Sequence, residues 1–178
     1  MNIVIGMCGG IACYKVCSVV GALKKNNFEV DVIMTKNATE FITPLTLRSL
    51  SNNPVVTDMF HETDNYDIKH ISLAQKADIL LVAPATANII GKVANGIADD
   101  MLSTVIMATK AKVVFAPAMN NNMYTNPIVQ ENIKKLKEHG YYFVEPQVGH
   151  LACGTEGIGK LADTKTIVDK VMEMAKWK

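Results

Sequence analysis

The sequence predicts an α/β domain built on one doubly wound parallel sheet, and three observations favour this class. Short apolar runs alternate with stretches of helical periodicity along most of the 178 residues. A glycine-rich turn separates the first apolar run from the first helical stretch, as at the start of a βαβ unit. The central runs are apolar at every position, which is typical of strands covered on both faces.

The first half of the chain contains two strands and two helices. Strands are predicted at residues 2–6 and 29–34, and a helix lies between them. The apolar face of that helix carries Val16, Val19, Val20 and Leu23. A second helix is predicted at about residues 38–50.

The second half continues the alternation. Strands are predicted at residues 79–83, 113–116 and 141–144, the last of which ends the sheet. Helices are predicted at residues 69–74, 86–95, 99–109, 127–139 and 164–177. Asn126 as cap, Pro127 as first helical residue and Gly140 after the end delimit one of these helices. Helices on both faces give a three-layer, flavodoxin- or Rossmann-like domain, and residues 1–178 form one domain.

Composition excludes several classes of protein. The net charge of +1 provides no electrostatic footprint for nucleic acid or an acidic membrane. The longest apolar run, residues 79–85, is too short to cross a bilayer. Four cysteines match neither a zinc framework nor a redox pair, so reduced thiols and a cytoplasmic location are expected.

Amide side chains follow the buried strand at 113–116. Residues 117–123 read Pro-Ala-Met-Asn-Asn-Asn-Met, which delivers amides to the carboxyl edge of the sheet, where open α/β folds bind ligands. Asn120, Asn121 and Asn122 are equally compatible with turn and cap roles, because asparagine hydrogen-bonds its own backbone. Both readings stay open on this segment alone.

Two further clusters lie at the same edge. Gly9 and Gly10 precede a helix whose amino end suits a phosphate, but the spacing is not that of a dinucleotide fingerprint. Thr35 stands where such a fingerprint has an acidic residue, which favours a mononucleotide. Thr86 follows the central strand and either contacts a ligand or only caps a helix.

A histidine and a cysteine complete the candidates. His70 opens a helix near the sheet edge, where it is either a catalyst or an ordinary surface or core residue. Cys153 lies in a glycine-rich loop, residues 151–159, predicted to be flexible. Its thiol is a reactive group if exposed and an incidental one otherwise.

In their order and spacing, His70, residues 117–123 and the Cys153 loop make the chain resemble the flavin-dependent cysteine decarboxylases. The resemblance covers residues 1–168, through the Gly-Gly-Ile-Ala-x-Tyr-Lys turn at 9–15, Ala-Pro-Ala-Thr-Ala-Asn at 83–88 and Asn-Gly-Ile-Ala-Asp-Asp at 95–100. It implies a chain that uses FMN to oxidise the cysteine end of 4′-phosphopantothenoylcysteine to a thioaldehyde. Loss of CO₂ then leaves an enethiol, whose reduction gives 4′-phosphopantetheine for coenzyme A biosynthesis.

The resemblance also assigns roles to residues. His70 is the expected catalytic base, Asn120 holds the substrate carboxylate, Met123 lines the substrate pocket, and Cys153 donates a proton in the reduction. No metal ligands are implied. The implied FMN contacts are Gly9, Gly10, Thr35, Thr86, Ala87, Asn88 and Ala118.

Partners and alternatives come from the same resemblance. The family builds its site between subunits of a homotrimer, often stacked into a dodecamer, and a separate phosphopantothenate–cysteine ligase is the expected pathway partner. No nucleic acid or membrane partner is expected. A peptidyl-cysteine decarboxylase and a non-catalytic flavin-binding regulatory protein are the alternatives. The chain departs from the family pattern at Cys8, where a hydroxyl donor is usual, at Gln75, often basic, and at Tyr124, expected to keep an aromatic wall in place of Trp.

Overall fold

The computed structural model describes residues 1–60, 68–150, 152, 154 and 156–176. In this part of the chain a parallel sheet of six strands runs in the order β3-β2-β1-β4-β5-β6. Its strands are β1 (Asn2–Met7), β2 (Glu29–Met34), β3 (Val55–Val56), β4 (Ile79–Ala85), β5 (Lys112–Pro117) and β6 (Tyr142–Phe143). The prediction of a single doubly wound parallel sheet is confirmed.

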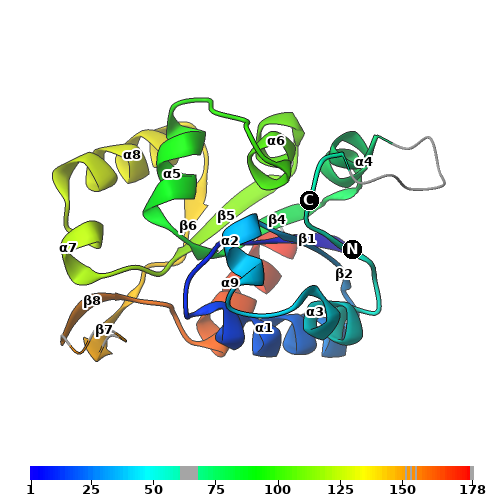
Figure 1. Cartoon of the computed structure of the whole chain (residues 1–178), viewed down its shortest axis with the longest axis horizontal. Coiled ribbons are helices and arrows are strands. Elements are labelled where there is room, and N and C mark those ends of the chain that lie inside the picture. Colours follow the sequence, from blue (N-terminus) through cyan, green and yellow to red (C-terminus); the bar gives the residue numbers. More distant parts are fainter. Residues whose placement is uncertain (61–67, 151, 153, 155, 177–178) are drawn as a thin grey trace.

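Helices cover both faces of the sheet (Figure 1). One face carries α1 (Cys13–Lys25), α3 (Pro44–Ser51) and α9 (Thr164–Ala175). The other face carries α4 (Lys69–Lys76), α5 (Ala87–Ala94), α6 (Met101–Ala108) and α8 (Pro127–Glu138). The short helices α2 (Lys36–Thr39) and α7 (Asn121–Tyr124) follow β2 and β5. Among the described helices, none combines the length and the apolar character that crossing a membrane requires.

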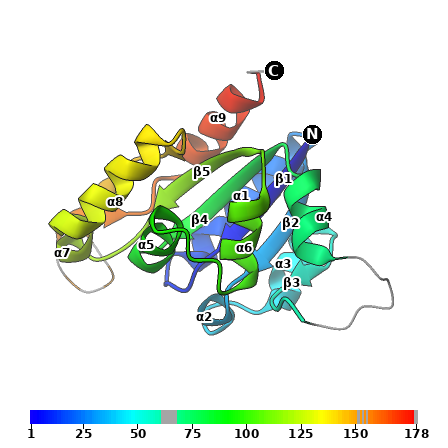
Figure 2. The same ribbon diagram turned by 90° about the horizontal axis from the view of Figure 1, so that it is seen from above.

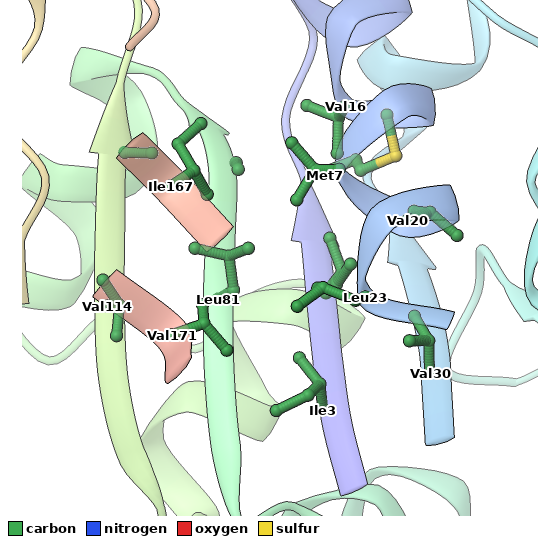
Figure 3. Close-up of a cluster of buried hydrophobic side chains, with 14 of the residues drawn as sticks. Ile3, Met7, Val16, Val20, Leu23, Val30, Leu81, Val114, Ile167 and Val171 are labelled. Carbon is green, nitrogen blue, oxygen red and sulfur yellow. The ribbon is translucent and has the colours of Figure 1, made fainter. Parts of the chain in front are cut away.

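Two apolar clusters, one on each face, hold these layers together. Figure 3 shows the face covered by α1 and α9, where Ile3, Met7 and Leu81 from the sheet pack with Leu23 and Val171. The alternate residues of the same strands pack against α5 and α6 on the other face. Because every residue of β4 is buried, this strand is apolar without alternation, as the sequence predicted.

The predicted helix at residues 38–50 was wrong in its continuity, because the structure divides it into α2 and α3. Pro44 is the first residue of α3, and Thr43 before it has extended backbone. Proline has no backbone N–H to donate and disfavours helical backbone in the preceding residue, so a helix begins at Pro44 instead of passing through it.

The end of the chain also differs from the prediction. After β6 come β7 (Gln147–His150) and β8 (Glu156–Lys160), which form a separate antiparallel hairpin. The expected flexible loop at residues 151–159 was therefore wrong for 156–159, which are strand. Glycine is a poor strand former, so the sequence gives no signal for β8, and cross-strand pairing with β7 provides the stability.

One ion pair joins strand β2 to helix α4. Asp31 on β2 is buried, and its Oδ2 atom has no hydrogen-bond partner of ordinary geometry within the described structure. The Nζ atom of Lys76, at the end of α4, lies 2.6 Å from this oxygen. Lys76 is therefore the charge partner that makes burial of this carboxylate tolerable.

Replacement of Lys76 by methionine is expected to lower the free energy of unfolding by about 2 kcal/mol, because the carboxylate of Asp31 stays buried without its partner. Urea denaturation measures this effect. Lys165→Met is the control, because its ion pair with Asp169 is exposed and contributes little. In the double variant Asp31→Asn/Lys76→Met most of the loss should be recovered, and an unchanged loss would contradict the assignment.

Candidate functional site

A cavity of about 630 Å³ opens at the carboxyl edge of the sheet. The β1–α1 turn, the β5–α7 connection and the β7–β8 hairpin form its walls, together with Thr86 at the end of β4. Parallel pairing of β1 and β5 with β4 places these connections side by side. The lining residues are Gly9, Gly10, Ile11, Ala12, Tyr14, Lys15, Thr86, Ala118, Met119, Asn120, Met123, His150, Ala152, Gly159, Lys160 and Leu161.

The β1–α1 turn has the properties of an anion site. A Cβ atom on Gly9 would lie 2.7 Å from the backbone carbon of Asn37, so only glycine lets the turn pack against α2. A Cβ atom on Gly10 would meet nothing within 4 Å. Beside these glycines lies Ala12, the N-cap of α1, which provides no side-chain cap. The N–H groups of Cys13 and Lys15 donate to the backbone oxygens of Gly10 and Ala12, so what this end of α1 offers an anion is chiefly the positive end of the helix dipole.

Cys8 lies behind this turn and does not line the cavity. Its side chain is buried, and burial raises the pKa of the thiol to about 12, against hydrogen bonds with Thr86 that lower it. The Cys13 thiol donates to the backbone oxygen of Cys8 at 3.1 Å. Cys8 is thus a neutral core residue of the turn in the described structure.

The β5–α7 connection brings part of residues 117–123, here called the amide segment, to the cavity. Ala118 donates its backbone N–H to the Ala85 oxygen at 3.0 Å, which fixes the segment beside the end of β4. Asn120 caps α7, because its Oδ1 atom accepts from the N–H of Asn122 at 2.8 Å, and it also lines the cavity. The cap role of Asn120 is confirmed, and its ligand role stays a prediction for a residue that lines the cavity. Thr86 likewise caps α5 and lines the cavity.

Tyr124 differs from its expected role. It was predicted to keep an aromatic wall, but it is buried in the second apolar cluster and is not a lining residue. Its hydroxyl donates to Glu145 Oε2 at 2.8 Å, and Lys137 Nζ lies 2.7 Å from Glu145 Oε1. Burial and Glu145 raise the pKa of Tyr124 to about 12. Although burial opposes it, hydrogen bonds from Lys137 and Tyr124 lower the pKa of Glu145.

The cavity unites six of the predicted site residues and leaves others outside. Gly9, Gly10, Thr86, Ala118, Asn120 and Met123 line it. Three predicted cofactor contacts do not: Thr35 caps α2, Ala87 begins α5, and Asn88 is exposed on α5.

Of the two predicted catalytic residues besides Asn120, the structure describes only His70. His70 lies on α4, and α6 lies between α4 and α5 (Figure 2), so His70 does not line the cavity of its own chain. Cys153 lies outside the described residues. Its described neighbours His150 and Ala152 line the cavity. The roles of His70 and Cys153 stay predictions.

Two lysines at the cavity were missed as candidates. Lys15 lies in the first turn of α1, with its ammonium 5.9 Å from the centroid of the Tyr14 ring, and Lys160 ends β8. Lys15 could have been found from its place in the Gly-Gly-Ile-Ala-x-Tyr-Lys turn. Lys160 gave no such signal, because β8 was not predicted.

The fold and this cavity define an α/β protein with a mononucleotide-type site at the carboxyl edge of its sheet. The family model described as Flavoprotein matches residues 1–176. The chain belongs to this family.

Two curated relatives extend the comparison. The chain is 49% identical over 171 residues to the coenzyme A biosynthesis bifunctional protein CoaBC of Borreliella burgdorferi, covering 96% of this chain and 44% of that protein. The chain thus spans less than half the length of this relative. It is 45% identical to the probable phosphopantothenoylcysteine decarboxylase of Streptococcus mutans, covering 97% of both proteins.

Solved structures give the same fold. A mutant PPC decarboxylase complexed with pantothenoylaminoethenethiol is similar with a TM-score of 0.88 and 27% identity, covering 98% of both chains. The FMN-dependent cysteine decarboxylase SpaF is similar with a TM-score of 0.83 and 30% identity, covering 98% of this chain and 97% of that one.

Replacement of Tyr124 by phenylalanine is expected to destabilise the chain by about 1 kcal/mol at pH 7, because the Glu145 carboxylate loses a hydrogen bond. Glu145 has a lowered pKa in the folded state, so its contribution is present above its unfolded pKa and lost as pH falls through its folded pKa. The difference from wild type should therefore shrink well below about pH 4.3. Denaturation at pH 7 and pH 3 measures it.

Tyr14→Phe is the control, because this ring is exposed. A Tyr124→Phe loss that is the same at both pH values would contradict the stated cause.

Proposed function

We propose that the chain is an FMN-dependent decarboxylase that converts 4′-phosphopantothenoylcysteine to 4′-phosphopantetheine in coenzyme A biosynthesis. The observation that carries this proposal is one cavity that joins an anion-binding glycine turn to the Asn120–Met123 segment. Similarity to a probable phosphopantothenoylcysteine decarboxylase along nearly its whole length supports this substrate. As part of a metabolic route, the chain is placed in the cytoplasm.

The residues at the turn fit an FMN phosphate. Gly10 leaves open space where a side chain would stand, and the uncapped amino end of α1 lies beside it. Thr86 and Ala118 line the cavity at the ends of β4 and β5, with room for a flat ring beside small side chains. FMN would supply the reversible two-electron redox chemistry that the oxidation and the reduction of the substrate need. Thr35, Ala87 and Asn88 are proposed as further contacts.

Asn120 and Met123 are proposed to hold the cysteine end of the substrate. The oxygen of the Asn120 amide accepts from the N–H of Asn122, and a carboxylate would be bound by the amide nitrogen, because only this end of the amide is a donor. Met123 is half exposed at the cavity and gives it an apolar wall. Lys15 and Lys160 bring positive charge, which favours a substrate with carboxylate and phosphate groups.

His70 and Cys153 are proposed to transfer protons in the first and the last step of the reaction. His70 takes a proton when the cysteine end is oxidised, and Cys153 gives one when the enethiol is reduced. Because His70 does not line the cavity of its own chain, we assign it to the cavity of a neighbouring subunit in a homotrimer, alone or stacked into a dodecamer. A separate phosphopantothenate–cysteine ligase would supply the substrate.

A peptidyl-cysteine decarboxylase is the second candidate, because the chain is also similar to SpaF, an FMN-dependent cysteine decarboxylase. The presence of Cys153 favours the coenzyme A substrate, since reduction of the enethiol needs a proton donor. Turnover of a peptide ending in cysteine, without turnover of phosphopantothenoylcysteine, would select the second candidate.

The purified protein is expected to be yellow, with a flavin absorption spectrum, and to remove CO₂ from phosphopantothenoylcysteine. Mass spectrometry of the product should show 4′-phosphopantetheine for wild type and a species lighter by two hydrogen atoms for Cys153→Ser. His70→Asn should keep the flavin and lose activity by at least about 100-fold, as for other general bases. A colourless protein that cannot be reconstituted with FMN would contradict the proposal.

Replacement of Gly10 by alanine is expected to weaken FMN binding by about tenfold or more, because the new methyl group enters cofactor space. The apoprotein should keep its melting temperature, because this methyl group meets no atom of the described residues within 4 Å, its two chain neighbours apart. Gly21→Ala is the matched control, since Gly21 is equally open but lies within α1, away from the cavity. Fluorescence titration with FMN measures both, and equal affinities would place the phosphate elsewhere.

A further inference from the structure

Within the described residues, two hydrogen bonds attach the β7–β8 hairpin to residues 119–121. Met119 donates its backbone N–H to the Gly159 oxygen at 2.9 Å. Ile158 donates its backbone N–H to Oδ1 of Asn121 at 3.1 Å. The second bond uses a side chain, so it depends on the residue at position 121.

Two glycines permit this close attachment. A Cβ atom on Gly157 would lie 2.7 Å from both Cγ and Oδ1 of Asn121. Gly159 has φ of +133°, and a Cβ atom there would collide with the Met119 oxygen. Glycine on each side of Ile158 therefore lets β8 lie directly against residues 119–121.

We propose that Asn121 is a positioning residue, which fixes the β7–β8 hairpin over the cavity. Asn120 lines the cavity and its neighbour Asn121 binds β8, so one short segment places both the substrate amide and the hairpin. His150 and Ala152, on the hairpin side, complete the cavity wall. The role does not require Asn121 to touch the substrate.

The catalytic consequence rests on the proposed function. Position 153 lies between β7 and β8 in the sequence, so we expect the attachment of the hairpin to affect delivery of the Cys153 proton. Reduction of the enethiol adds a hydride, returned from the FMN reduced in the first step, and a proton from Cys153. Decarboxylation needs neither. Loosening the hairpin should therefore slow the reduction more than the decarboxylation, and enethiol should be released.

The test uses the FMN-loaded oligomer with three variants at neighbouring positions. Asn121→Ala removes the acceptor, Asn121→Asp keeps it, and Asn122→Ala is the matched control, because Asn122 is exposed and does not line the cavity. Amide hydrogen exchange at Ile158 should become about tenfold faster in Asn121→Ala, the equivalent of one lost hydrogen bond. It should stay near wild type in Asn121→Asp and Asn122→Ala.

The product ratio is the catalytic readout. The ratio of enethiol to 4′-phosphopantetheine should rise about tenfold in Asn121→Ala, in step with the opening of the hairpin, and should not rise in Asn122→Ala. Unchanged exchange at Ile158 in Asn121→Ala would overturn the inference and leave the proposed function standing. Absence of decarboxylation in wild type would overturn the proposed function, while the exchange measurement would still test the attachment.

A variant of Gly157 tests the same contact independently, in case Asn121→Ala does not fold. Gly157→Ala pushes the Asn121 side chain away from Ile158, so it should also speed exchange there. Both substitutions break the same contact, so the double variant Asn121→Ala/Gly157→Ala should cost less than the sum of the single variants. Strict additivity of the two effects would overturn the inference.

Discussion

The pairing of β4 with β1 on one side and β5 on the other is the interaction on which the rest of the structure depends. All seven residues of β4 are buried, and helices cover both faces of the sheet around it. Parallel pairing brings the carboxyl ends of these three strands to one edge, so the connections that follow them meet there. The cavity is a consequence of this alignment, because two of its walls begin where β1 and β5 end, and Thr86 follows β4.

The amino ends of the helices determine what this edge can bind. Thr86 and Asn120 satisfy the first N–H groups of α5 and α7 with their own side chains, and they line the cavity at the same time. Helix α1 has no such cap, although it is longer than either of them. The positive end of its dipole is therefore left to an anion, although the N–H groups of Cys13 and Lys15 donate to backbone oxygens. The polar side chains and the positive end of a helix dipole thus lie in neighbouring connections at one edge of the sheet. Neither of them requires a chain with a large net charge.

The sequence predicted the parts of this structure that local chemistry controls. Continuous apolar runs located β1, β2, β4 and β5, and the amides and glycines after them located Asn120, Gly9 and Gly10 at the cavity. It failed where stability comes from contacts distant in the chain. Strand β8 is rich in glycine and exists through pairing with β7 and attachment to Asn121, 37 residues away. The relation of His70 to the cavity could not be predicted from periodicity, because it depends on how helices of one or more chains are arranged.

The attachment of the hairpin suits the chemistry proposed for the cavity. The floor of the site belongs to the sheet, whose strands cannot move without exposing two apolar clusters. Within the described residues, two hydrogen bonds join the hairpin to residues 119–121, and Ile158 of β8 packs against the second apolar cluster. The hairpin is therefore held by the segment that carries Asn120 and by the core that supports the sheet. Because these contacts are shared, the floor of the cavity and the wall formed by the hairpin are positioned together.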